Sequence, residues 1–111
     1  MNRQRDEIPP GTLEMLILTT LSAGLAKHGF EIAERILAVS DDVLQVQEGS
    51  LYPALQRMLL KGWILGDWGK TEENRRARFY QLTAAGRRQL DQELERYRRV
   101  ARAIARVLAT A

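Results

Sequence analysis

The chain has 111 residues, no cysteine and one histidine. We expect one compact domain rather than two, because domains of this length are common and 45% hydrophobic residues are normal for a globular protein. The missing cysteines exclude disulfides and zinc–thiolate sites, and a single histidine cannot form a multi-histidine metal site in one chain. No apolar run approaches the roughly 20 residues that span a bilayer, and no signal-peptide stretch opens the sequence. We therefore expect a soluble, cytoplasmic protein with no membrane partner.

The net charge of +3 is unevenly distributed along the chain. Residues 1–47 carry 4 Lys/Arg against 7 Asp/Glu, whereas residues 48–82 carry 6 against 4 and residues 83–111 carry 7 against 3. A basic second half is typical of a protein that binds a polyanion such as nucleic acid, and equally of a well-solvated helix face. Charge alone does not decide between these two interpretations.

The first third of the chain predicts two helices. Thr12 follows Pro9-Pro10-Gly11 and is placed to cap the first helix, while the residues before Pro9 are expected to be loose. The apolar positions of this helix recur every three or four residues, at Leu13, Leu16, Ile17, Thr20 and Leu21. A turn at residues 27–29 then leads to a second helix. Its inward-facing positions are Phe30, Ile32, Ala33, Ile36 and Leu37.

A third helix follows a connector over residues 41–49, in which Asp41, Asp42 and Gly49 are the helix-breaking residues. Its apolar face, predicted to lie in the core, consists of Leu51, Leu55, Met58 and Leu59. Pro53 is expected in the opening turn, where its missing N–H costs nothing. Gly62 ends the helix.

The pattern changes after Gly62. The runs WILGDW and RFYQL are short and rich in aromatic and β-branched residues, which indicates two strands. The polar segment GKTEENRRA between them, with Gly69 and Asn74 as turn formers, makes a β-hairpin with a long loop. Thr83 is placed to cap a final long helix. Its apolar positions form a heptad seam, at Leu90, Leu94, Tyr97, Ala101, Ile104 and Leu108.

The order helix, helix, helix, strand, strand, long helix predicts a mainly α protein with a small β-hairpin, of the α+β class. Three helices followed by a hairpin are typical of a winged helix-turn-helix. We divide the chain into a winged helix-turn-helix DNA-binding unit over residues 1–82 and a C-terminal dimerisation helix over residues 83–111, packed as one compact unit. The seam can serve self-association or pack back onto the first helix; we favour a homodimer.

In a helix-turn-helix the third helix enters the major groove of double-stranded DNA. The side of that helix opposite its core face carries Ser50, Tyr52, Pro53, Gln56 and Arg57. Tyr52 can meet phosphate, sugar or a thymine methyl, Gln56 can read adenine, and Arg57 can reach guanine or phosphate. The alternative for Tyr52 is a packed position under the hairpin.

The hairpin tip is basic and is predicted to form the wing. Its cationic residues are Lys70, Arg75, Arg76 and Arg78. A basic loop beside a reading helix can lie along a phosphate backbone or enter the minor groove. The neighbouring Glu72 and Glu73 support the alternative of a solvated tip without a ligand.

Catalytic and cofactor sites are not expected. The sequence has no Walker-type or G-x-G-x-x-G phosphate-binding loop, and no nucleophile–base arrangement. His28 is assigned to a turn or a helix cap. We therefore predict that the protein is not an enzyme and needs no cofactor or metal.

Four motifs resemble the PadR family of bacterial winged-helix transcriptional regulators. They are GTLEMLILTTL, HGFEIAERI, EGSLYPALQRMLLKGWI and RRARFYQLTAAGRRQL, which cover most of residues 11–90 in order. The resemblance implies a dimeric DNA-binding protein, usually a repressor that acts on an inverted-repeat operator. It carries the third-helix role to Ser50, Tyr52, Pro53 and Gln56, the wing role to Arg75, Arg76 and Arg78, and dimerisation to the last helix.

The resemblance also implies a flat aromatic effector between the subunits in some members. Trp63, Trp68 and Tyr97 can stack on such a molecule, although core packing is the better interpretation. Met58-Leu59-Leu60 departs from the family's usual leucine and glutamate, and adds an apolar group that enlarges the core or lines a cavity. The alternative function is a winged-helix module that binds another protein and has no operator.

Overall fold

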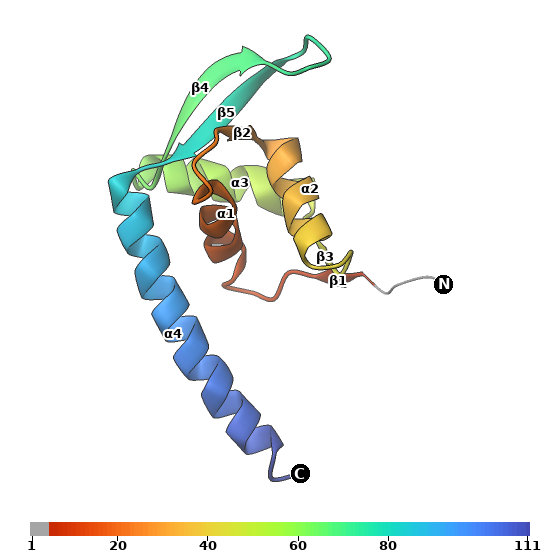
Figure 1. Cartoon of the computed structure of the whole chain (residues 1–111), viewed down its shortest axis with the longest axis vertical. Coiled ribbons are helices and arrows are strands. Elements are labelled where there is room, and N and C mark those ends of the chain that lie inside the picture. The colour runs from red at the N-terminus through yellow and green to blue at the C-terminus, as the bar shows by residue number, and fades with distance from the viewer. Residues whose placement is uncertain (1–4) are drawn as a thin grey trace.

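The computed structural model describes residues 5–111 and has a winged-helix architecture with a long C-terminal helix (Figure 1). The fold is of the α+β class, as predicted. In chain order its elements are β1 (Asp6–Glu7), α1 (Leu13–Leu21), β2 (Lys27–His28), α2 (Gly29–Val39), β3 (Leu44–Gln45), α3 (Glu48–Leu60), β4 (Ile64–Lys70), β5 (Arg76–Leu82) and α4 (Ala84–Leu108).

The core lies among the first three helices, the base of the hairpin and the start of α4. Its least exposed side chains come from all of these elements and include Ile17, Leu18, Ile32, Leu51, Leu55, Met58, Ile64 and Leu90. The predicted inward face of α3 is confirmed, with Leu59 only partly buried. Phe30 was expected in the core, but 63% of it is exposed. It occupies the first turn of α2, which extends past the core toward the hairpin.

The sheet has three strands in the order β2-β5-β4, all antiparallel. The hairpin strands pair from Ile64 with Leu82 to Lys70 with Arg76. The prediction of a turn at residues 27–29 is wrong, because Lys27 and His28 pair with Tyr80 and Phe79 on the free edge of β5. These two residues are too few to show an alternating pattern, so only the partner strand identifies them as a strand.

The segment before α1 is more ordered than expected. Asp6 and Glu7 form β1, which pairs in parallel with Leu44 and Gln45 of β3, and the backbone N–H of Asp6 also donates to the carbonyl of Val43 at 2.7 Å. The prediction of a loose segment before Pro9 is therefore wrong for these two residues, and its part over residues 1–4 lies outside the described residues. The predicted connector also contains β3. Asp41 and Asp42 follow α2 with φ of 59° and 64°, which agrees with their predicted role as helix-breaking residues.

Helix α3 begins earlier than predicted, at Glu48, so Gly49 lies inside the helix rather than in the connector. Pro53 consequently lies in the second turn instead of the opening turn. A proline here cannot donate to the carbonyl four residues earlier, which is that of Gly49. The helix nevertheless continues to Leu60, and Gly62 follows it with φ of 74°, which confirms the predicted end.

The hairpin strands are longer and the loop is shorter than the sequence suggested. Gly69 was expected in the turn but belongs to β4, where the ring of Phe79 covers its Cα. The connecting residues are 71–75, and Asn74 takes the predicted turn role with φ of 62°. Arg78 therefore lies within β5 and not at the tip.

Two threonines were predicted to cap helices, and they behave differently. Thr83 Oγ1 accepts a hydrogen bond from the backbone N–H of Gly86 at 3.0 Å, which confirms the cap of α4. Thr12 occupies the position before α1, but its hydroxyl donates to the carbonyl of Pro9 at 2.7 Å and does not cap the helix. The backbone between Pro9 and Thr12 turns sharply enough to bring that carbonyl within reach.

Candidate nucleic-acid interface

The predicted DNA-reading residues of α3 are all exposed but point in three directions. Residues spaced three or four apart share a helix face. Gly49, Pro53, Gln56 and Leu60 therefore form a solvent-facing ridge, which we call the α3 ridge. Gln56 is its only side chain with hydrogen-bonding groups. In the apolar run at the end of α3, Met58 is buried, Leu59 packs partly buried against the core and Leu60 is 79% exposed, so the run extends the core through Leu59 and not through Leu60.

Tyr52 lies on the flank of α3 that faces α2. Its ring rests against Gly29 at the start of α2, so closely that a Cβ on Gly29 would lie 3.0 Å from both Cε1 and the hydroxyl. The side chain is still 49% exposed. One edge of the Tyr52 ring therefore packs between α3 and α2, and the other edge is exposed to solvent. The side chain is neither fully exposed nor fully packed under the hairpin, which were the two predicted positions.

Arg57 lies on the opposite flank of α3, toward α1. Its Nε–H donates to Oε1 of Glu14 at 3.0 Å, which makes an ion pair between residues 43 positions apart. Ser50, seven residues earlier, is exposed on the same flank. The α3 ridge is therefore bordered by a tyrosine tied to α2 and an arginine tied to α1.

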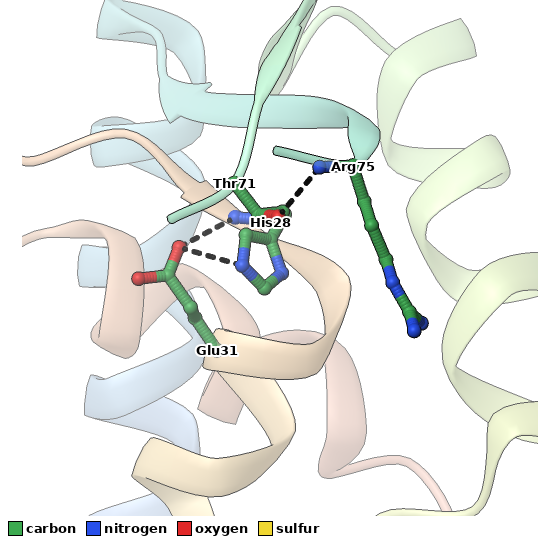
Figure 2. Close-up of polar contacts among 4 residues, drawn as sticks. All are labelled: His28, Glu31, Thr71 and Arg75. Carbon is green, nitrogen blue, oxygen red and sulfur yellow. Dashed lines mark hydrogen bonds and ion pairs between the residues drawn. The ribbon is translucent and has the colours of Figure 1, made fainter. Parts of the chain in front are cut away.

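The wing presents its charges on both sides of a short turn. Lys70, Arg75 and Arg76 are exposed, and the guanidinium of Arg76 stacks 4.3 Å above the centre of the Trp68 ring. The turn is closed by paired bonds between Thr71 and Arg75, in which the backbone N–H of Arg75 donates to Thr71 Oγ1 at 3.2 Å (Figure 2). These bonds give the tip a defined shape.

Arg78 is held differently from the other wing cations. Its side chain crosses Gly66, where any Cβ would collide with its Nε, and it is partly buried. Within residues 5–111, no acceptor meets this buried Nε. Its neighbour Tyr80 is almost fully buried, and burial raises the pKa of the Tyr80 hydroxyl, while the charge of Arg78 acts in the opposite direction.

His28 is the N-cap residue of α2, which is one of the two roles predicted for it. Oε1 of Glu31 accepts a hydrogen bond from the backbone N–H of His28 at 3.1 Å and lies 3.5 Å from its Nε2 (Figure 2). The imidazole also meets the Phe79 ring edge-on at 5.4 Å. An open groove runs from here to the wing and is lined by acids (Glu31, Glu34, Glu72, Glu73) as well as by the wing cations.

The seam of α4 divides into two parts. Leu90 is 3% exposed and Leu94 is partly buried against the core, whereas Tyr97, Ile104 and Leu108 are 49%, 53% and 67% exposed. Of the tryptophans, Trp63 packs partly buried against the core, as expected. Trp68 is 61% exposed on the wing, so core packing is the wrong interpretation for Trp68 and for Tyr97.

Over the described part of the chain, no group of three or more His, Asp or Glu side chains is arranged to hold a metal ion. No helix within residues 5–111 is both long and apolar enough to cross a membrane.

A sequence model of the transcriptional regulator PadR-like family matches residues 17–92. The chain belongs to the PadR-like family. Membership in a family of transcriptional regulators also confirms the prediction of a non-enzymatic protein. An uncharacterised protein of Lysinibacillus sphaericus is 26% identical over 96 residues, which cover 86% of this chain and 87% of that protein.

Several solved structures share the fold. A transcriptional regulator from Clostridium thermocellum superimposes with a TM-score of 0.78 and 26% identity, covering 86% of this chain and 92% of that chain. A PadR family regulator from Clostridium difficile has a TM-score of 0.74 and 26% identity, covering 88% and 99%. Bacillus subtilis PadR in complex with operator DNA has a TM-score of 0.66 and 22% identity, covering 75% and 47%.

Sequence reasoning missed three residues that shape this candidate interface. Glu14 is an acid in the first turn of α1, a common feature of helices, yet it binds Arg57 of α3. Gly29 and Gly66 have no side chain to attract notice, although Tyr52 and Arg78 occupy the space a Cβ would fill. Each of these contacts joins two different elements of the fold, so only the three-dimensional structure assigns it.

Proposed function

We propose that this PadR-like protein is a sequence-specific DNA-binding transcriptional regulator. In this proposal it acts as a repressor that binds an inverted-repeat operator as a homodimer in the bacterial cytoplasm. The observation that carries the proposal is the exposed α3 ridge with Gln56, together with the groove that joins neighbouring Tyr52 to the wing cations. In such an arrangement the helix would enter the major groove and the cations would meet the phosphates. The likeness of the fold to that of Bacillus subtilis PadR, which was solved with operator DNA, supports it.

The contacts follow from where each side chain lies. Gln56, on the α3 ridge, is the candidate for a bidentate contact with adenine, and Pro53 and the exposed edge of Tyr52 offer apolar contact to a thymine methyl. In this proposal Ser50 and Arg57, on the flank toward α1, contact phosphates. The wing would follow the DNA backbone through its cations, which are Lys70, Arg75, Arg76 and Arg78.

The dimer would form through the exposed part of the α4 seam. In this proposal residues 1–82 bind DNA and residues 83–111 dimerise, through Tyr97, Ala101, Ile104 and Leu108, with Leu90 and Leu94 anchoring the helix to its own core. Two copies of α3 would then enter successive major grooves about 34 Å apart, and the bound dimer would exclude RNA polymerase. A small aromatic effector, if one binds between the subunits, would meet Tyr97 on this stripe.

The test is binding of the purified protein to DNA from upstream of its own gene and to a shuffled duplex of equal length, across a salt series. We expect tighter binding to the upstream DNA, with log affinity falling linearly with log salt concentration. Weak binding with little dependence on salt would favour the alternative, a protein-interaction module without an operator.

Replacing Gln56 tests the reading role of the α3 ridge directly. We expect Gln56→Ala to weaken binding to the upstream DNA by roughly 5- to 150-fold, which is the range for losing one bidentate base contact. Affinity for the shuffled duplex should stay unchanged. The matched control is Gln92→Ala, an exposed glutamine of α4, which should bind like the unmodified protein. Equal losses on both duplexes would remove Gln56 from the base-reading role.

A further inference from the structure

We propose that Glu14 is a positioning residue for DNA binding, which holds Arg57 in place to bind a backbone phosphate beside the major groove. The inference rests on the proposed function and adds a residue from α1 to an interface otherwise built from α3 and the wing. It also assigns Arg57 to phosphate rather than to guanine, two roles that the sequence left open.

The geometry leaves most of the Arg57 guanidinium free for a ligand. A guanidinium has five N–H donors, and the bond to Glu14 uses the one on Nε. Among residues 5–111, no second acceptor bonds to this group. The four N–H donors on the terminal nitrogens therefore stay available, and they form the fork that matches a phosphate.

The exposed fractions of the two side chains suit a fixed partner, Glu14, and a side chain that can still bind a ligand, Arg57. The Glu14 side chain is only 19% exposed, whereas that of Arg57 is 54% exposed. A long arginine side chain loses conformational entropy when it binds a ligand. A partner that already restricts the side chain reduces the entropy that is lost on binding. Such a half-exposed ion pair contributes little to folding stability, so stability alone does not account for it.

The position of Arg57 on α3 selects phosphate over base. The α3 ridge, with Gln56, points outward, and Arg57 lies on its flank toward α1. In a major-groove docking, the outward ridge meets the base edges and the flanks meet the two sugar–phosphate walls. The tether to Glu14 keeps the guanidinium on its flank and away from the ridge.

Glu14 has two opposite effects on DNA binding, and their difference provides a test. Its negative charge repels nearby phosphates, so removing the charge alone should tighten binding. Its contact orders Arg57, so removing the contact should weaken binding. Glu14→Gln removes the charge but keeps an oxygen that can accept from Nε, whereas Glu14→Ala removes both.

We would measure operator affinity for both variants across a salt series, in the unmodified chain and in an Arg57→Ala background. We expect Glu14→Ala to bind roughly threefold to tenfold more weakly, a fraction of the loss from deleting a charge-assisted hydrogen bond. Glu14→Gln should bind at least as tightly as the unmodified protein. In the Arg57→Ala background, Glu14→Ala should bind equally well or more tightly.

Salt dependence provides a second readout that a structural role would not change. Arg57→Ala should reduce the slope of log affinity against log salt by about 0.9, the value for one phosphate contact. The matched control Glu95→Ala, an exposed acid of α4, should change neither affinity nor slope.

Tighter binding of Glu14→Ala in both backgrounds would overturn the inference, because it would leave only the repulsive charge. Equal weakening in both backgrounds would also overturn it, because the effect would not pass through Arg57. If the unmodified protein shows no preference for upstream DNA and no salt dependence, the proposed function fails, and the inference fails with it.

Discussion

The two ends of α4 carry the same apolar pattern but have different surroundings. At its start, Leu90 is 3% exposed in the core and Thr83 caps the first turn. At its far end, Leu108 is 67% exposed and the helix extends beyond the other helices (Figure 1). The heptad spacing is continuous across both ends, so the pattern predicts a buried stripe without saying which chain buries it.

The two parts of the seam differ in how much of each side chain the chain itself covers. Residues of the seam near the start of α4 meet the helical core of their own chain, and Tyr97, Ile104 and Leu108 further along are 49%, 53% and 67% exposed. An exposed stripe of this kind on a regular helix is typical of a helix that pairs with a second copy. The proposed homodimer explains why the pattern is kept where the chain itself provides no partner.

The largest expected effect is on stability at the anchored end of α4. Leu90→Ala should lower the free energy of unfolding by roughly 2–5 kcal/mol, as large-to-small changes in a core do. Urea denaturation followed by circular dichroism measures it, in a monomeric background that carries Ile104→Glu. The matched control Leu108→Ala should change the free energy by less than about 0.5 kcal/mol, as surface changes do. Equal losses at both positions would remove the distinction between the two ends.

The second effect concerns the far end and the dimer. Ile104 is 53% exposed, so Ile104→Glu should leave the fold intact while placing like charges against each other in a paired seam. We expect sedimentation to show a monomer, and operator affinity to fall by about 100-fold or more, because the two half-sites are no longer bound by one particle.

The control for that variant is Ala103→Glu, which adds the same charge on the outward face of α4. It should remain dimeric and bind the operator as the unmodified protein does. A dimer that persists in Ile104→Glu would show that the subunits meet elsewhere.

The smallest effect is at the first turn of α4. Thr83 Oγ1 accepts from the N–H of Gly86 and donates to the carbonyl of Gly62 at 2.6 Å, so it joins the helix to the end of α3. Thr83→Ala should lower stability by about 1 kcal/mol, the usual cost of losing a cap. Thr110→Ala, at the other end, should have no measurable effect in the same thermal unfolding experiment. A neutral Thr83→Ala would mean that packing alone fixes the start of α4.

The elements that the sequence predicted well are those with a long periodic pattern. The core face of α3, the two strands of the hairpin and the long helix α4 all repeat a signal over several turns or strand residues. The elements that it missed, β1, β2 and β3, are two residues each. Such strands depend on a partner that is distant in the sequence, as Lys27 and His28 depend on β5.

The candidate site was predictable as a set of exposed residues, but not in its internal arrangement. Exposure of Gln56 and Arg57 follows from the period of α3. The contacts of Tyr52 with Gly29 and of Arg57 with Glu14 join different helices, so no local pattern contains them. They divide one predicted surface into the α3 ridge and two flanks that contact α2 and α1, which changes the role we propose for each residue.

Hydroxyl-radical footprinting on DNA upstream of the gene tests the central proposal most directly, with the unmodified protein and Ile104→Glu compared at the same concentration. We predict two protected segments in an inverted repeat, with centres about 34 Å apart along the helix, and loss of both segments in Ile104→Glu. A single protected segment of the same extent with both proteins would contradict a dimer that places two copies of α3 on one operator.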